Sequence, residues 1–172
     1  MSGRKKEPGK HSQFDEELII QKLWKGGRGR CADIGARDER GSNTYALWKK
    51  GWFCQFIDKD VNGLLKAYPV GSGNHEVVHA TVTPENVNEI LAPNLDLLSI
   101  DIDGDDYYVW KAVKQTPKIV IIETNPKKKS GVQELRHEGD YEGCSVETMT
   151  KLGKEKGYNL YGKTGVNLVF FR

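Results

Sequence analysis

Cysteine is scarce in this sequence: Cys31, Cys54 and Cys144 are the only three among 172 residues. Their number is odd, they lie far apart, and no spacing between them matches that of a metal-binding motif. Two of them fall in segments that we predict to be strands, where cysteine acts as a small buried hydrophobic residue. This usage is typical of a reducing, intracellular setting.

Long apolar runs are also lacking. No run in the sequence approaches the roughly 20 residues that are needed to span a bilayer. The N-terminal segment has no apolar core of the kind found in a signal peptide. We therefore expect a soluble, cytoplasmic protein with no membrane partner.

An excess of charge of either sign is missing as well, because the formal net charge is only +2. The net charge of the chain therefore gives no indication that its partner is a nucleic acid or a membrane surface. Positive charge is nevertheless gathered at two places, an N-terminal group and a later run of lysines: Arg4, Lys5, Lys6 and Lys10, then Lys127, Lys128 and Lys129. Such runs are usually solvated faces, so nucleic acid stays an alternative partner only.

The length of the chain is sufficient for one domain with a real core. Residues 1–12 are polar and basic and contain glycine and proline, which predicts a disordered tail. We assign residues 13–172 to a single domain. The sequence contains no internal repeats.

Strand and helix patterns alternate along this domain. The predicted strands are 30–34, 52–57, 76–81, 95–102 and 118–123, and the predicted helices are 14–24, 42–50, 61–68, 84–91, 107–114 and 146–152. Residues 157–160 and 166–171 then predict two strands of a hairpin with its turn at 162–165. The alternation predicts an α/β fold with one doubly wound, mostly parallel, seven-stranded sheet. The closing hairpin places one antiparallel strand at or near the edge of the sheet.

The segment 95–102 reads as a strand buried on both faces, because nearly all its side chains are apolar. Four aspartates crowd its end: Asp101, Asp103, Asp105 and Asp106. Like charges repel, so a fold gathers them only where solvent, a metal ion or the hydrogen-bond donors of a ligand offset the repulsion. A solvated loop accounts for Asp105 and Asp106 better than for Asp101 and Asp103.

Acids also end the first and second predicted strands, at Asp33 and Asp58. The carboxyl ends of parallel strands face one crevice, and an acid after the second strand can accept both hydroxyls of a ribose. The first loop lacks G-x-G-x-x-G, because Gly35 is followed by Arg37 and Glu39. A pyrophosphate needs those close backbone approaches, so NAD and FAD are disfavoured. A nucleoside without phosphates needs only one tight turn.

Several segments now form a recognisable succession: Asp33-Ile34-Gly35-Ala36, Ser42-Asn43-Thr44, Gly51-Trp52, Ile57-Asp58, the run from Asp96 to Gly104, Glu123-Thr124-Asn125, and the hairpin from Gly157 to Asn167. Together they resemble class I S-adenosylmethionine-dependent methyltransferases, and among these the FkbM-like group. The resemblance covers residues 30–172 and implies a Rossmann-like methyltransferase fold with S-adenosylmethionine as cofactor. Arg37 and Asp38 stand where the first loop of the family is usually rich in glycine.

The resemblance also implies which residues bind the cofactor: Asp33, Gly35, Ala36, Asp58, Ala80, Thr81 and Asp101. The first three would line its methionine end, and Asp58 would hold its ribose. Ala80 and Thr81 would edge the adenine. Asp101 would lie with Asp103 close to the transferred methyl group.

Methyl transfer to a hydroxyl requires alignment and a base. Asp103 is our first candidate for that base, or for a metal ligand. Glu123 and Asn125 would complete an oxygen-ligand site for Mg²⁺, unless they only tie down the following loop by hydrogen bonds. His137 lies in the long polar loop 124–144, and its ordinary pKa suits general-base work near neutral pH. A lone loop histidine is more often a surface residue.

The preferred acceptor is a sugar or another small hydroxyl compound. Three alternatives stay open: a methyltransferase acting on nucleic acid, a catalytically inactive binder with the same fold, and a Mg²⁺-dependent phosphatase using Asp101 and Asp103. In such phosphatases the corresponding pair of aspartates normally lies at the first strand of the domain, whereas Asp101 and Asp103 lie at the end of the fourth predicted strand. The sequence leaves the oligomeric state open.

Overall fold

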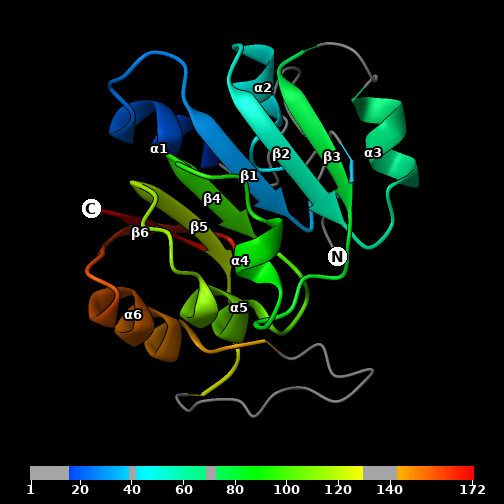
Figure 1. Ribbon diagram of the computed structural model, residues 1–172. Coiled ribbons are helices and arrows are strands. Elements are labelled where there is room, and N and C mark those ends of the chain that lie inside the picture. Colours follow the sequence, from blue (N-terminus) through cyan, green and yellow to red (C-terminus); the bar gives the residue numbers. More distant parts are fainter. Residues whose placement is uncertain (1–15, 39–41, 69–72, 130–142) are drawn as a thin grey trace, which may run out of the picture.

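The computed structural model describes residues 16–38, 42–68, 73–129 and 143–172. These residues form one seven-stranded sheet of order β3-β2-β1-β4-β5-β7-β6, with helices on both faces (Figure 1). The predicted α/β fold, with a doubly wound and mostly parallel sheet and a closing antiparallel hairpin, is confirmed. The tail predicted at 1–12 lies outside the described residues.

The strands and helices follow one another in the predicted order. The strands are β1 (Arg30–Ile34), β2 (Phe53–Asp58), β3 (His75–His79), β4 (Leu97–Ile100), β5 (Ile119–Glu123), β6 (Asn159–Thr164) and β7 (Asn167–Phe171). The helices are α1 (Glu16–Leu23), α2 (Tyr45–Lys49), α3 (Asn62–Ala67), α4 (Val87–Ile90), α5 (Asp106–Ala112) and α6 (Val146–Glu155). Among the described residues, no helix is long and apolar enough to cross a membrane.

Two apolar layers hold the helices on the sheet. Side chains of α1, α2 and α3 pack on one face, where Ile20, Leu47 and Leu64 are buried. Side chains of α4, α5 and α6 pack on the other face, around Trp110 and Met149. Strands β4 and β5 lie between the two layers, and their buried residues are apolar except for Ser99, as expected for parallel strands covered on both faces.

The register of the parallel strands brings their carboxyl ends to one level. Ile34 of β1 pairs with Ile57 of β2 and with Ile100 of β4, and Ile100 pairs with Ile122 of β5. The residues that follow these positions therefore emerge at the same edge of the sheet. Three acids emerge there, namely Asp58, Asp101 and Glu123.

The hairpin differs from the prediction in the position of its turn. Strand β6 runs through Thr164, so the predicted turn residues 162–164 belong to the strand, and the chain reverses at Gly165, which has a φ of +58°. A register shift between Leu160 and Gly162 lets β6 continue past Gly162. Strand β7 is antiparallel to both neighbours and lies next to the edge strand β6.

Two predicted helices begin later than expected. The helix predicted from Ser42 begins at Tyr45, because the Ser42 hydroxyl donates to Asp33 at 2.7 Å and does not cap the helix. The helix predicted from residue 84 begins at Val87. The strand predicted at 95–102 is shorter, 97–100, because the chain leaves the sheet at Asp101.

Candidate functional site

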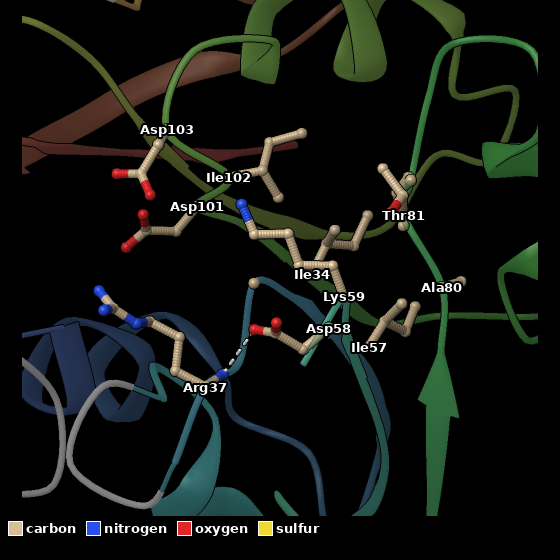
Figure 2. Close-up of a pocket in the computed structure, with 12 residues that line it drawn as sticks. Ile34, Arg37, Ile57, Asp58, Lys59, Ala80, Thr81, Asp101, Ile102 and Asp103 are labelled. Atoms are coloured by element: carbon tan, nitrogen blue, oxygen red, sulfur yellow. Dashed lines mark hydrogen bonds between the residues drawn. The ribbon is translucent and has the colours of Figure 1, made fainter. Parts of the chain in front are cut away.

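A cavity of about 280 Å³ opens at the carboxyl edge of β1, β2 and β4 (Figure 2). Most of the residues predicted to bind the cofactor line it: Gly35, Asp58, Ala80, Thr81 and Asp101, together with Asp103. They come from the loops after β1, β2, β3 and β4, so they are brought together by the level register of the sheet. Apolar walls are supplied by Ile34, Ile57, Val82 and Ile102.

Asp58 is held in this cavity by two backbone N–H groups. Its Oδ2 accepts from the N–H of Arg37 at 3.0 Å, and its Oδ1 accepts from the N–H of Asp60 at 2.8 Å. The first donor belongs to the loop after β1 and the second to the turn after β2. A carboxylate has about four acceptor positions, so the two oxygens can still accept hydrogen bonds from a ligand.

The loop after β1 packs tightly against the chain after β4. Gly35 has a φ of +82°, and a Cβ at this position would overlap the carbonyl oxygen of Asp101. The N–H groups of Gly35 and Ala36 both donate to the carbonyl of Ile57, at 2.8 and 3.3 Å. Only glycine fits here, because any side chain would push the two loops apart.

Asp33 and Ala36 do not line the cavity, although the sequence analysis placed them at the methionine end of the cofactor. Side chains alternate along β1, so Ile34 faces the cavity while Asp33 faces the α1–α3 layer. Asp33 is 2% exposed and accepts hydrogen bonds from the hydroxyls of Ser42 and Thr44, at 2.7 and 2.9 Å. Burial raises the pKa of the Asp33 carboxyl. Asp33 therefore connects β1 to Ser42 and Thr44, and Ala36 is buried in the α1–α3 layer.

Three carboxylates meet beside the cavity. Asp101, Asp103 and Glu123 each offer an oxygen, and these oxygens lie within 4.8 Å of one another. Figure 2 shows the carboxylates of Asp101 and Asp103 next to each other. This all-oxygen set fits a hard divalent cation such as Mg²⁺.

The carboxylates in this group titrate unusually. Burial, with the nearby charges of Asp101 and Asp106, raises the pKa of Glu123 to about 9. Burial also raises the pKa of Asp101 to about 6, while a hydrogen bond from Glu123 acts in the opposite direction. The interaction between the two side chains raises the pKa of Glu123 and lowers that of Asp101, so it favours the shared proton on Glu123.

Asp106 is a buried residue of the site that sequence reasoning missed. It is 2% exposed, which contradicts the interpretation of this position as a solvated loop. Its two oxygens accept from the N–H groups of Ile102 and Gly104, each at 3.0 Å, and burial raises its pKa to about 7. These bonds close the turn in which Asp103 adopts a φ of +58°. The signal in the sequence was the spacing of an aspartate two residues after the turn glycine.

Two positively charged residues at the cavity, Lys59 and Arg37, were not among the predicted site residues. Lys59 lines the cavity from the end of β2, and Figure 2 shows its side chain extending towards Asp101. Arg37 lines it from the first loop, with a φ of +50° that is unusual for a residue other than glycine. The positive charge of Arg37 lowers the pKa of Asp101, against the larger effect of burial.

A second cavity of about 310 Å³ adjoins the first and shares Asp103 with it. Glu123 and Asn125 line this cavity. The side-chain oxygen of Asn125 accepts from the N–H of Lys127 at 3.0 Å, and its own N–H donates to the carbonyl of Cys144 at 2.8 Å. These two bonds connect Asn125 to Lys127 and to Cys144. His137 lies outside the described residues.

Comparisons by sequence and by structure give different results. No family profile matches the sequence, and no curated protein matches it. Solved structures do match. A 1,6-didemethyltoxoflavin N1-methyltransferase from Burkholderia thailandensis, with S-adenosylhomocysteine bound, has a TM-score of 0.60 at 12% identity, over 91% of this chain and 74% of the other.

Two further structures show the range of the similarity. A methyltransferase of calicheamicin biosynthesis, also with S-adenosylhomocysteine, has a TM-score of 0.52 at 15% identity over 91% of this chain. This chain spans 53% of that enzyme, about half of its length. A protein from Streptococcus thermophilus, provisionally described as a hemolysin, has a TM-score of 0.60 at 15% identity, over 95% of this chain and 69% of the other.

Identities this low show the fold and leave the activity and the FkbM-like resemblance as predictions. The strand order, the closing antiparallel hairpin and the matching structures all agree. The chain has the fold of the class I S-adenosylmethionine-dependent methyltransferases.

Proposed function

We propose that this chain is an S-adenosylmethionine-dependent methyltransferase of the FkbM-like kind that methylates a hydroxyl group of a sugar or another small molecule. The observation that carries the proposal is the setting of Asp58. Its carboxylate is fixed by two N–H donors in a cavity that Gly35, Thr81 and Asp101 also line, at the edge of the sheet where ligands bind in open α/β folds.

The residues around the cavity suit the parts of the cofactor. Asp58 would accept from the two ribose hydroxyls with the acceptor positions that Arg37 and Asp60 leave open. Ala80 and Thr81, which follow β3, would edge the adenine. Gly35 and Asp101 would border the methionine end, where the guanidinium of Arg37 can pair with a carboxylate.

Asp103 is the proposed base. When bound, the cofactor supplies a methyl group on a positively charged sulfur. Asp103 lies at the junction of the two cavities and is exposed, so it can take a proton from an acceptor in the second cavity as the methyl group arrives from the first. His137 stays a second proposed base.

The cluster of Asp101, Asp103 and Glu123 would hold Mg²⁺ if the enzyme uses a metal. A bound Mg²⁺ would lower the pKa of an acceptor hydroxyl and orient it. Asn125, the further ligand expected from the sequence, directs its side-chain oxygen to the N–H of Lys127. The three carboxylates alone are therefore the proposed ligands from this chain.

The lining of the second cavity favours a polar acceptor. Among the described residues that line it, carboxylates, an amide, a hydroxyl and a lysine predominate, and none is aromatic. Hydroxyl-rich compounds such as sugars suit these groups, because each hydroxyl can both donate and accept. None of the described lining residues offers an aromatic ring on which a nucleobase could stack.

Calorimetry with S-adenosylhomocysteine tests the proposal. We expect binding by the wild-type chain and, in a second assay, transfer of a labelled methyl group from S-adenosylmethionine to a member of a panel of sugars. Absence of binding would contradict the proposal. Binding without transfer to sugars, oligonucleotides or other hydroxyl compounds would favour the inactive binder. Release of phosphate from p-nitrophenyl phosphate with Mg²⁺ would favour the phosphatase.

A further inference from the structure

Gly63 of α3 touches the first loop from outside the cavity. A Cβ at this glycine would lie 2.6 Å from the carbonyl oxygen of Arg37 and 3.5 Å from its carbonyl carbon. The nearest atom belongs to the backbone, so it cannot move aside as the tip of a flexible side chain can. Any residue other than glycine at position 63 would displace the loop at Arg37.

Arg37 carries the two groups that matter at this contact. Its N–H donates to Oδ2 of Asp58 at 3.0 Å, and its carbonyl lies against Gly63. The φ of +50° at Arg37 sets the directions of both groups relative to each other. A shift of the carbonyl away from α3 therefore turns the N–H away from Asp58.

The loop after β1 has no further glycines close behind Gly35, and it reaches its conformation by other means. Gly35 makes room for the chain after β4, and Gly63 makes room for the loop on the side of α3. The left-handed conformation of Arg37, which disfavours a residue with a side chain, is held between Asp58 and α3.

We propose that Gly63 is a positioning residue for the cofactor site: by admitting the Arg37 carbonyl against α3, it aims the Arg37 N–H at Asp58 and so fixes the carboxylate that receives the ribose. This inference rests on the proposed function and deepens it. It assigns a role in cofactor affinity to a residue that contacts neither cavity.

The test is Gly63→Ala, with binding of S-adenosylhomocysteine measured by calorimetry. We expect the affinity to fall about tenfold or more, because a charge-assisted hydrogen bond that orients Asp58 is weakened. The thermal midpoint of the variant shows whether the displacement of the loop also destabilises the rest of the chain. Gly162→Ala is the matched control, since a Cβ there meets nothing within 4 Å, and its affinity should equal that of the wild type.

A double-mutant cycle separates this role from a general structural effect. In an Asp58→Ala background, Gly63→Ala should change the affinity by less than about twofold, because the carboxylate that it positions is gone. Equal tenfold effects in both backgrounds would overturn the inference. So would a Gly63→Ala chain that binds S-adenosylhomocysteine as tightly as the wild type does.

Hydrogen exchange of the Arg37 amide tests the contact without any ligand. We expect slow exchange in the wild type and exchange at least about tenfold faster in both Gly63→Ala and Asp58→Ala. If Gly63→Ala does not fold, unchanged exchange in Asp58→Ala still overturns the inference. A wild-type chain that fails to bind S-adenosylhomocysteine overturns the proposed function instead, and the exchange rates then judge the contact alone.

Discussion

The acids at the end of β2 and those at the ends of β4 and β5 share one edge of the sheet but have opposite environments. Asp58 accepts two backbone N–H bonds. Asp101 and Glu123 lie close together with Asp103. Burial raises the pKa values of both, with Asp33 and Asp103 adding to the effect on Asp101, and Asp101 and Asp106 adding to that on Glu123. The first site is already organised to accept hydrogen bonds. In the second site the carboxylates repel one another, and a proton, a metal ion or a cationic ligand would reduce that repulsion.

This difference suggests a division of labour between binding and chemistry. A fixed carboxylate with spare acceptor positions serves recognition, because it needs no reorganisation when hydroxyls arrive. Carboxylates whose proton is easily shared suit proton transfer or metal binding. The following predictions test that division.

The largest expected effect is on turnover, in Asp103→Asn. An amide cannot take up the acceptor proton, so the rate of methyl transfer should fall by about 10²–10⁴-fold. Calorimetry with S-adenosylhomocysteine should show affinity close to that of the wild type, because Asp103 lies at the acceptor side. A variant that loses affinity but keeps its rate of transfer would reverse the proposed division.

The next effect is on cofactor binding, in Asp58→Ala. Loss of the ribose hydrogen bonds should weaken binding of S-adenosylmethionine by roughly 1–3 kcal/mol. Asp60→Ala is the control, because its backbone N–H still reaches Asp58 while its exposed carboxylate is removed. Unchanged affinity in Asp58→Ala would count heavily against the cofactor assignment.

An effect of similar size concerns folding stability, in Glu123→Gln. The folded chain holds a proton on Glu123 up to about pH 9, whereas the unfolded chain releases it near 4.5. Folding stability contributed by this group is therefore present below pH 4.5 and is lost progressively as the pH rises to 9. Glutamine mimics the protonated form, so the variant should be more stable at pH 8, on the order of 1–3 kcal/mol after allowance for solvent.

Urea unfolding at pH 4.5 and pH 8 measures this effect. The two chains should have similar free energies of unfolding at pH 4.5 and should diverge as the pH rises. A variant that is less stable than the wild type at pH 8 would show that the charge conflict between Asp101 and Glu123 is absent.

The smallest expected effect is that of Mg²⁺ on the thermal midpoint of the wild type. A cation that replaces the shared proton should stabilise the chain at pH 8 by about 1 kcal/mol at a concentration several times its dissociation constant. Thermal unfolding with Mg²⁺ or with EDTA measures the shift. If Mg²⁺ shifts the thermal midpoint of Asp103→Asn equally, the ion binds elsewhere. If it shifts neither midpoint, the carboxylates do not bind Mg²⁺ and proton transfer is their remaining proposed role.

The order of elements was predictable because it depends on local patterns. Apolar runs with acidic ends predicted β4 and β5, and the spacing of Val61, Leu64 and Leu65 predicted α3. The convergence of Asp58 and Asp101 followed as well, because parallel strands of one sheet end at a common edge. These inferences require only the periodicity of the chain and the direction of its strands.

Other features depended on hydrogen bonds that the hydrophobic periodicity of the chain does not indicate. Asp33 faces the α1–α3 layer, where the hydroxyls of Ser42 and Thr44 donate hydrogen bonds to its carboxylate. Asp106 became buried because two N–H groups of the preceding turn converge on it. Neither outcome can be read from residue type alone.

The sequence by itself determined the class of fold, the succession of strands and helices, and the convergence of Asp58 and Asp101 at the edge of the sheet. Only the tertiary structure decided which of those acids are held by N–H donors, which share a proton, and that Gly63 of α3 admits the carbonyl of Arg37. The physical reason is that hydrophobic periodicity is a local property. Hydrogen-bond partners and close backbone approaches are set by how separate elements pack.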